Sequence, residues 1–204
     1  MRSGLTFLVV EDEAAVRRLL LRGLSEHGEV DAVSTCAAAR LAFRGRKYDA
    51  IIMDVRLPDG SGLDLIELAQ KRSPAAIVLV LTGSTDHAVI ERTLELGARY
   101  LLKPYHAKHL AIVANEAWAR RTAADRRTKL TLERWAKDHD LSVTEVELLA
   151  LGAEGVPRHE FSERRNVRPD TIRKQIQMLL QKTGDDTFEG AVNSLLREAV
   201  AEPT

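Results

Sequence analysis

The sequence has little of what marks a secreted or membrane-bound protein. It holds one cysteine, Cys36, so no disulfide can form within the chain. Its longest strongly apolar run, 75–81, has seven residues, whereas a membrane-spanning helix needs roughly twenty. The N-terminus reaches an acidic residue at Glu11 without a basic start or a long apolar stretch, which argues against a signal peptide. These absences favour the reducing cytoplasm as the location of the protein.

The chain also lacks a net charge that would point to a partner. Lys and Arg together number 30, and so do Asp and Glu. Apolar residues make up 45% and charged residues 29%, fractions that are typical of a globular chain and argue against a disordered one. A length of 204 residues suits two domains of ordinary size. Any indication of function must therefore come from local patterns.

The first part of the chain alternates short apolar strands with amphipathic helices. We expect strands at 5–10, 30–34, 49–54, 76–81 and 99–102, and helices at about 13–27, 36–45, 61–72, 85–96 and from 106 onward. This repeated alternation predicts an α/β fold with a parallel sheet and helices on both faces. The runs 51–53 and 77–81 are continuously apolar, which is typical of central strands.

The rest of the chain differs in character. Residues 118–140 contain seven basic and four acidic residues and neither Gly nor Pro, so we interpret them as a helical linker that continues the fifth helix. Residues 141–204 show no strand signal and predict an all-α domain of four short helices. Ser142 and Glu145 have the spacing of a capping box, and Gly184 ends the third helix. The predicted organisation is a first domain over 1–117, the linker over 118–140 and a helical domain over 141–204.

Polar side chains follow four predicted strands of the first domain at the point where each strand ends. They are Glu11, Asp12, Asp54, Thr82 and Lys103. Because ligands of open parallel sheets bind at the carboxyl ends of strands, we expect these side chains to meet at one edge. Three carboxylates repel one another unless a cation lies among them, and Mg²⁺ prefers such hard oxygen ligands.

This constellation suits phosphoryl transfer. An Asp carboxylate can act as a nucleophile and form an aspartyl phosphate, and Asp54 is best placed to do so. Lys103 can neutralise charge on the phosphoryl group, and Thr82 can donate a hydrogen bond to it. Acidic residues are also common at helix starts because the helix dipole favours negative charge there, and we accept this interpretation for Glu13. We reject it for the whole set, since four independent strand ends would have to coincide.

Residues 1–117 resemble a response-regulator receiver domain. The matching stretches are 9–13 (VVEDE), 53–62 (MDVRLPDGSG), 81–83 (LTG) and 100–104 (YLLKP). The resemblance implies a flavodoxin-like, doubly wound sheet of five parallel strands, and a receiver that catalyses only its own phosphorylation and dephosphorylation. It also implies that a sensor histidine kinase phosphorylates Asp54.

The same resemblance assigns roles to residues at the edge of the sheet. Mg²⁺ would be bound by Asp12, Asp54 and the backbone carbonyl of Arg56, with Glu11 assisting. Lys103 would bind the phosphoryl group. Thr82 and Tyr100 would form the switch pair, and the bond between Lys103 and Pro104 is expected to be cis. Glu11 stands where the family usually has Asp, and the positions of Arg56 and Ser84 tune dephosphorylation in this family.

Two helices of the C-terminal domain, joined through Asn166, have the spacing of a helix-turn-helix. In that motif the second helix enters the major groove of DNA. Here it begins near Pro169, and its polar side chains suit phosphates and base edges. They are Thr171, Arg173, Lys174 and Gln177. Residues 158–175 hold six basic and three acidic residues, but 141–204 as a whole hold eight basic and eleven acidic ones. Charge alone therefore leaves DNA binding undecided.

Residues 141–199 resemble a LuxR-type helix-turn-helix domain, as in the NarL/FixJ group of response regulators. The matching stretches are 141–145 (LSVTE), 148–151 (LLAL), Gly155, 170–173 (DTIR) and 180–184 (LQKTG). The resemblance implies binding to double-stranded DNA and a homodimer formed on DNA through the helix from Thr187 onward. Three residues depart from the family pattern: Arg165 replaces an apolar residue, Arg168 a Ser cap and Gln175 a frequent His.

The sequence thus predicts a cytoplasmic two-component response regulator that uses Mg²⁺, is phosphorylated on Asp54 and controls transcription by binding DNA as a homodimer. Two alternatives stay open. In one, the helical domain is an adaptor that docks a protein partner, which its net charge of −3 (eight basic against eleven acidic residues) favours. In the other, the receiver is a phosphate sink and the output domain is vestigial. Enzymatic turnover of a metabolite is not expected, since no other nucleophile–base set stands out.

Overall fold

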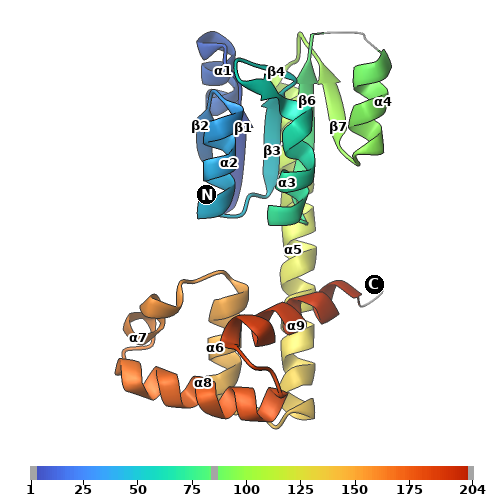
Figure 1. The fold of residues 1–204 in the computed structure, drawn as a ribbon. Helices are drawn as coiled ribbons and strands as arrows, with labels where there is room; N and C mark the ends of the chain where they lie inside the picture. Colours follow the sequence, from blue (N-terminus) through green and yellow to red (C-terminus); the bar gives the residue numbers. More distant parts are fainter. Residues whose placement is uncertain (1–3, 84–86, 202–204) are drawn as a thin grey trace. The chain divides into compact units, whose positions relative to one another are not determined.

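The N-terminal part of the chain is built on a five-stranded parallel sheet (Figure 1). The computed structural model describes residues 4–83 and 87–201. The strands are β1 (Leu5–Val10), β2 (Gly28–Val33), β3 (Ala50–Asp54), β6 (Ile77–Thr82) and β7 (Arg99–Leu102). Their order, β2-β1-β3-β6-β7, is that of flavodoxin-like folds. The predicted α/β class and parallel sheet are confirmed.

Helices cover both faces of this sheet. On one face lie α2 (Cys36–Gly45) and α3 (Ile66–Arg72), whose apolar residues pack with alternate residues of β1, β3 and β6. On the other face lie α1 (Ala14–Ser25) and the first part of α5 (Ala107–Asp138), which pack with the intervening residues. The helix α4 (His87–Glu95) lies beside β7 (Figure 1). Successive residues of β6 face opposite sides of the sheet, and helices cover both sides, so β6 is buried along its whole length.

The segment after β3 contains a hairpin that hydrophobic periodicity does not predict. Its strands, β4 (Arg56–Leu57) and β5 (Gly60–Ser61), are antiparallel and lead into a 3₁₀ turn at Gly62–Leu65. The helix predicted over 61–72 therefore becomes α-helical only at Ile66. Strands of two residues are too short to leave a periodic pattern. The helix predicted over 85–96 is α4, and positions 85 and 86 lie outside the described residues.

The second compact unit, 122–204, is helical in its described part, as predicted. It contains α6 (Val143–Ala153), a 3₁₀ turn (Arg158–Glu160) that runs into α7 (Phe161–Arg164), α8 (Pro169–Thr183) and α9 (Phe188–Ala201). The predicted helix cap, turn and helix end are present. Ser142 and Glu145 form the capping box, Asn166 takes a left-handed conformation with φ 50°, and Gly184 ends α8 with φ 77°.

The helix α5 is continuous from Ala107 to Asp138 and includes nearly all of the segment predicted as a linker. The boundary between the two compact units, 1–121 and 122–204, falls within it. Its last turns contribute Leu132 and Trp135 to the core of the second unit, where Trp135 Nε1 donates a hydrogen bond to Glu198 at 2.9 Å. In the ranges that the structure describes, no helix has the length and apolar character needed to cross a membrane.

The second unit depends on a buried carboxylate. Glu145 is 2% exposed and accepts hydrogen bonds from the Ser142 amide at 2.7 Å, the Ser142 hydroxyl at 2.8 Å and Lys182 Nζ at 2.8 Å. Burial raises the pKa of Glu145, but the hydrogen bonds from Lys182 and Ser142 outweigh it and hold the pKa below its ordinary value of 4.5. The charged form is therefore the one that the fold stabilises.

Replacing Glu145 by Gln should destabilise the second unit by about 2 kcal/mol at pH 7, because charge-assisted hydrogen bonds are lost. Since the folded pKa is below 4.5, this stabilisation is complete above pH 4.5 and is lost as the pH falls through the folded value. Urea unfolding at pH 7 and in acid measures the difference between wild type and variant, which should shrink in acid. The exposed Glu189→Gln is the matched control; an equal deficit at both pH values would contradict the argument.

Candidate functional site

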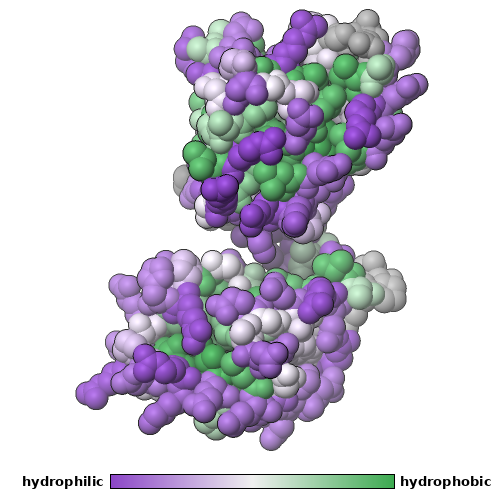
Figure 2. All heavy atoms as spheres, viewed as in Figure 1, coloured by the Kyte–Doolittle hydropathy of each residue, from purple (hydrophilic) through white to green (hydrophobic). Residues whose placement is uncertain are grey.

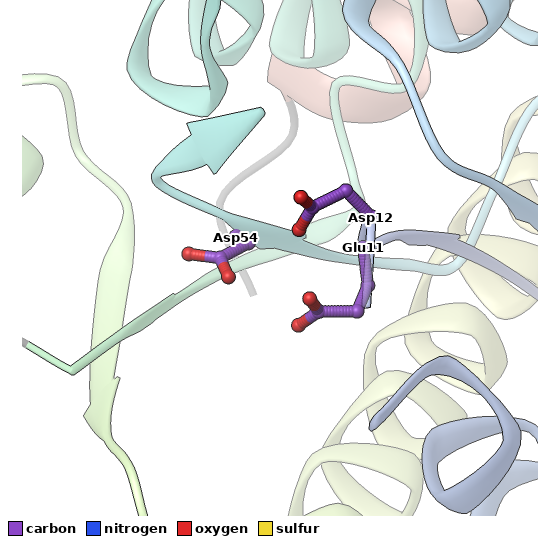
Figure 3. A group of neighbouring side chains, drawn as sticks. All are labelled: Glu11, Asp12 and Asp54. Carbon is purple, nitrogen blue, oxygen red and sulfur yellow. The ribbon is translucent and has the colours of Figure 1, made fainter. Parts of the chain in front are cut away.

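Three carboxylates meet at the carboxyl edge of the parallel sheet. Glu11 and Asp12 follow β1, and Asp54 ends β3. These strands are neighbours with Val10 opposite Met53, so their ends coincide. One oxygen atom from each carboxylate lies within 4.8 Å of the others, and Figure 3 shows Glu11 and Asp12 reaching toward Asp54. Glu11 is fully buried and Asp12 is exposed. The expected meeting of these acids is what the structure shows.

Lys103, which follows β7, lies among these acids. Its Nζ is 2.6 Å from Asp54 Oδ2 and 2.9 Å from Glu11 Oε2. Burial lowers the pKa of Lys103, but the hydrogen bonds to Asp54 and Glu11 outweigh it and raise the pKa above its ordinary value. Burial raises the pKa of Glu11, although the hydrogen bond from Lys103 opposes the rise. One ammonium thus balances one of three carboxylate charges.

The donor set fits a hard divalent cation. Its groups are carboxylate oxygens, which Mg²⁺ prefers, and three acids with one lysine leave two negative charges to be balanced when all are ionised. Within residues 4–83 and 87–201, it is the one group of three His, Cys, Asp or Glu side chains close enough to share an ion. The chemistry of the cluster therefore suits the expected Mg²⁺.

Backbone groups and one arginine hold the loops that carry the acids. The amide of Glu13 donates to Glu11 Oε1 and the amide of Arg56 to Asp54 Oδ1, each at 3.2 Å. Arg17 of α1 donates from Nη1 to the carbonyl oxygens of Glu11 at 2.7 Å and Asp12 at 3.0 Å. Sequence reasoning missed Arg17, because an arginine on an amphipathic helix belongs to no motif. Its place just over one helical turn after Asp12 was the only signal.

The residues expected to respond to phosphorylation lie on β6 and β7. Thr82 ends β6, is 2% exposed and accepts a hydrogen bond from the Lys103 amide on its carbonyl oxygen at 2.8 Å. Tyr100 lies on β7 opposite Val80 and is 39% exposed. The peptide bond between Lys103 and Pro104 is cis. Ser84, expected to influence dephosphorylation, lies outside the described residues.

Tyr105 is a second residue that sequence reasoning missed. Its hydroxyl is buried and has no hydrogen-bond partner among the described residues. Burial, followed by the negative charge of Glu11, raises the pKa of Tyr105 to about 12. The hydroxyl therefore stays protonated and in the electrostatic field of the acid cluster. Nothing in the sequence distinguishes this tyrosine from an ordinary core aromatic residue.

The outer face of α8 is the second candidate site. Ile172, Ile176 and Leu179 are buried, as their spacing predicts. The four residues proposed to contact DNA are exposed, namely Thr171, Arg173, Lys174 and Gln177. Figure 2 shows a largely hydrophilic surface along this helix. Arg168 caps α8 without a side-chain hydrogen bond, and Pro169 begins the helix.

Arg165 and Gln175 bond to each other inside the second unit. Arg165 Nη1 donates to Gln175 Oε1 at 2.7 Å, and Arg165 Nη2 lies 3.1 Å from Glu147 Oε2. These bonds link the end of α7 to α6 and α8, and the Arg165 side chain is only 16% exposed. Arg173 pairs with Asp170 at 3.0 Å on the exposed face. Part of the basic charge counted in the sequence is therefore engaged within the domain.

Residues 7–115 match the family model of the response regulator receiver domain. The chain belongs to the response regulator family. This response regulator is 34% identical over 202 residues to the transcriptional regulatory protein TcrA of Mycobacterium tuberculosis, covering 94% of this chain and 75% of TcrA. It is 29% identical over 188 residues to the DNA-binding transcriptional activator DevR/DosR of the same organism, covering 86% and 87% of the two chains.

Solved structures agree on the fold. The non-phosphorylated HemR receiver domain from Leptospira biflexa is 30% identical, with a TM-score of 0.51 over 56% of this chain and 94% of that chain. Full-length FixJ from B. japonicum aligns over 98% of this chain and 100% of its own, with a TM-score of 0.53 and 21% identity. The response regulator thus shares its fold with FixJ over nearly the whole chain.

Replacing Tyr105 by Phe should leave the free energy of unfolding unchanged or raise it by about 1 kcal/mol, because a buried hydroxyl without a partner is removed while the ring remains. Urea unfolding without added metal measures the change. The control is Tyr48→Phe: that hydroxyl donates to Asp31 Oδ2 at 2.8 Å, so its removal should be destabilising. A loss for Tyr105→Phe as large as that for Tyr48→Phe would show that the hydroxyl has a partner.

Proposed function

We propose that this response regulator acts in the cytoplasm, where a sensor histidine kinase phosphorylates Asp54 and thereby controls transcription through DNA binding by the second unit. The observation that carries the proposal is the contact of Lys103 Nζ with Asp54 Oδ2 at 2.6 Å inside a cluster of three carboxylates. A nucleophilic carboxylate, an oxygen-rich cation site and a lysine able to bind phosphoryl oxygens are the parts that phosphoryl transfer needs.

In this proposal each residue of the cluster has a defined task, and Asp54 has two. An Asp54 oxygen attacks the phosphorus of a phosphohistidine, and the P–N bond to the imidazole breaks. Glu11, Asp12, Asp54 and the Arg56 carbonyl would hold Mg²⁺, which when bound neutralises charge on the phosphoryl oxygens. Lys103, already at hydrogen-bond distance from Asp54, would then bind a phosphoryl oxygen instead. The protein turns over no metabolite and acts only on its own aspartyl phosphate.

The same cluster supports a switch. Thr82 ends the strand next to β3, and we propose that its hydroxyl donates a hydrogen bond to a phosphoryl group on Asp54. A new hydrogen bond there would draw the end of β6 toward Asp54. We propose that the partly exposed Tyr100 then changes position, so that a local electrostatic event alters the surface of β7.

DNA binding by α8 is supported by the exposed Thr171, Arg173, Lys174 and Gln177 over a buried apolar stripe. DevR/DosR is named as a DNA-binding activator and TcrA as a transcriptional regulatory protein. The acidic balance of 141–204 weakens non-specific attraction to DNA, so we propose that binding to double-stranded DNA depends on a homodimer.

An adaptor function is the second candidate. It is favoured by the net charge of −3 over 141–204 and by the ion pair that Arg173 makes with Asp170 within the helix. In that case the exposed face of α8 would bind a protein. A third outcome, a vestigial output unit behind a phosphate sink, would show phosphorylation with no change in DNA affinity.

Asp54→Asn should abolish uptake of a phosphoryl group from acetyl phosphate in the presence of Mg²⁺, because an amide keeps the shape of the carboxylate but is a poor nucleophile. Asp12→Ala should fail as well, through loss of a metal ligand. Intact-protein mass spectrometry detects the added phosphoryl group. The exposed Asp64→Asn, on the turn after the hairpin, is the control and should be labelled like wild type. Stoichiometric labelling of the Asp54→Asn protein would refute the assignment.

Arg173→Ala and Lys174→Ala should both weaken binding to a DNA site selected from pooled genomic fragments. Truncating a residue that pairs with guanine should cost about 1–3 kcal/mol and relax base choice at one position, whereas truncating a phosphate contact should reduce the salt slope by about one unit. Gel shifts at several salt concentrations separate the two effects. The exposed Lys137→Ala on α5 serves as control. Wild-type binding by both α8 variants would favour the adaptor.

A further inference from the structure

The hairpin that follows Asp54 is tied to a helix far away in the sequence. Asp59 lies in the turn between β4 and β5, and its carboxylate reaches the N-terminus of α2. Its Oδ1 accepts a hydrogen bond from the Cys36 amide at 2.7 Å, and its Oδ2 accepts one from the Ala37 amide at 2.8 Å. Both carboxylate oxygens are thus used at one helix terminus.

This contact completes the capping of α2. The first amides of a helix have no partner within the helix. Thr35 accepts from the Ala38 amide at 3.1 Å through its side chain, and its carbonyl accepts from the Ala39 amide, also at 3.1 Å. Asp59 accepts from the two amides that Thr35 does not reach. These amides hold the pKa of Asp59 below its ordinary value, so a negative charge faces the positive end of the helix.

Further contacts bring the hairpin close to α2. The thiol of Cys36 donates to the Ser61 carbonyl oxygen at 3.6 Å. A Cβ atom added to Gly60, which has φ 155°, would lie 3.4 Å from Cys36 Sγ.

At the other end of the hairpin, the Gly62 amide donates to the Val55 carbonyl at 2.9 Å, and a Cβ on Gly62 would lie 2.0 Å from the Asp54 carbonyl oxygen. The backbone is therefore closely fitted at both ends.

The hairpin carries atoms of the proposed cation site. Arg56, the first residue of β4, donates its amide to Asp54 Oδ1, and its carbonyl is the backbone ligand proposed for Mg²⁺. Strands of two residues have too few hydrogen bonds of their own to be rigid. Mg²⁺ requires nearly ideal octahedral geometry, so loose ligands bind it poorly. A contact from another element must therefore hold the hairpin in position if the Arg56 carbonyl is to bind Mg²⁺.

We propose that Asp59 is a positioning residue for the cation site: by joining the β4–β5 hairpin to the N-terminus of α2, it keeps the Arg56 carbonyl and the Asp54 carboxylate in place for Mg²⁺. Asp59 does not itself bind the ion. The inference rests on the proposed function, since it concerns the cation used in phosphorylation.

Two variants separate positioning of the ion from simple capping of α2. Asp59→Asn removes the bond to one of the two amides, because its NH₂ group cannot accept a hydrogen bond, and weakens the bond to the other. Thr35→Ala instead removes the bond to Ala38 and leaves the contact between Asp59 and the helix intact. Both should lower the urea midpoint. Isothermal titration with MgCl₂ should show the dissociation constant rising about tenfold in Asp59→Asn, as for other residues that orient metal ligands, and staying at the wild-type value in Thr35→Ala.

Each result decides a different question. Unchanged Mg²⁺ affinity in Asp59→Asn, or an equal loss in Thr35→Ala, would overturn the positioning role while leaving the proposed function standing. A wild-type protein that takes up no Mg²⁺ would overturn the proposed function itself. Amide hydrogen exchange of the wild type needs no variant: the Cys36 and Ala37 amides should be protected like that of Ala38, and rapid exchange of both would also overturn the inference.

Discussion

The arrangement of the first unit depends on the contacts of Lys103 with Glu11 and Asp54. Three carboxylates at one sheet edge repel one another, and the ammonium group, 2.6 Å from Asp54 and 2.9 Å from Glu11, offsets part of that repulsion. The cluster keeps a negative excess that suits a divalent cation. A cation and a phosphoryl group would thus meet at a site where the protein has already placed charges of both signs.

Elements around the acid cluster fix the positions of its atoms at the carboxyl edge of the sheet. The register of β1, β3 and β6 aligns the strand ends, Arg17 holds the carbonyl groups of the loop after β1, and Asp59 joins the β4–β5 hairpin to α2. None of these supports belongs to the acid cluster. They act on backbone atoms, whose positions decide where carboxylates and carbonyl oxygens can meet an ion.

The second unit shows why charge counts are poor guides to its function. Its acidic balance argues against attraction to DNA, yet the basic residues are not equivalent. Arg165 is mostly buried and bonded to Gln175 and Glu147, whereas Lys174 is exposed on α8. A buried guanidinium contributes to the packing of the helices, and only the exposed groups can reach a ligand. The surface of α8 is therefore more basic in character than the unit as a whole.

The sequence by itself determined the order along the chain of the helices and of the five strands of the parallel sheet, the residues at the ends of those strands and the buried stripe of α8, because these follow from periodicity along the chain. It also indicated the capping box at Ser142 and the left-handed turn at Asn166. Only the tertiary structure decided that Asp59 caps α2, that Arg165 bonds to Gln175 and that the Tyr105 hydroxyl is buried in the electrostatic field of the acids. These contacts join groups on different elements, and local sequence patterns carry no information about which groups face each other across a packed interior.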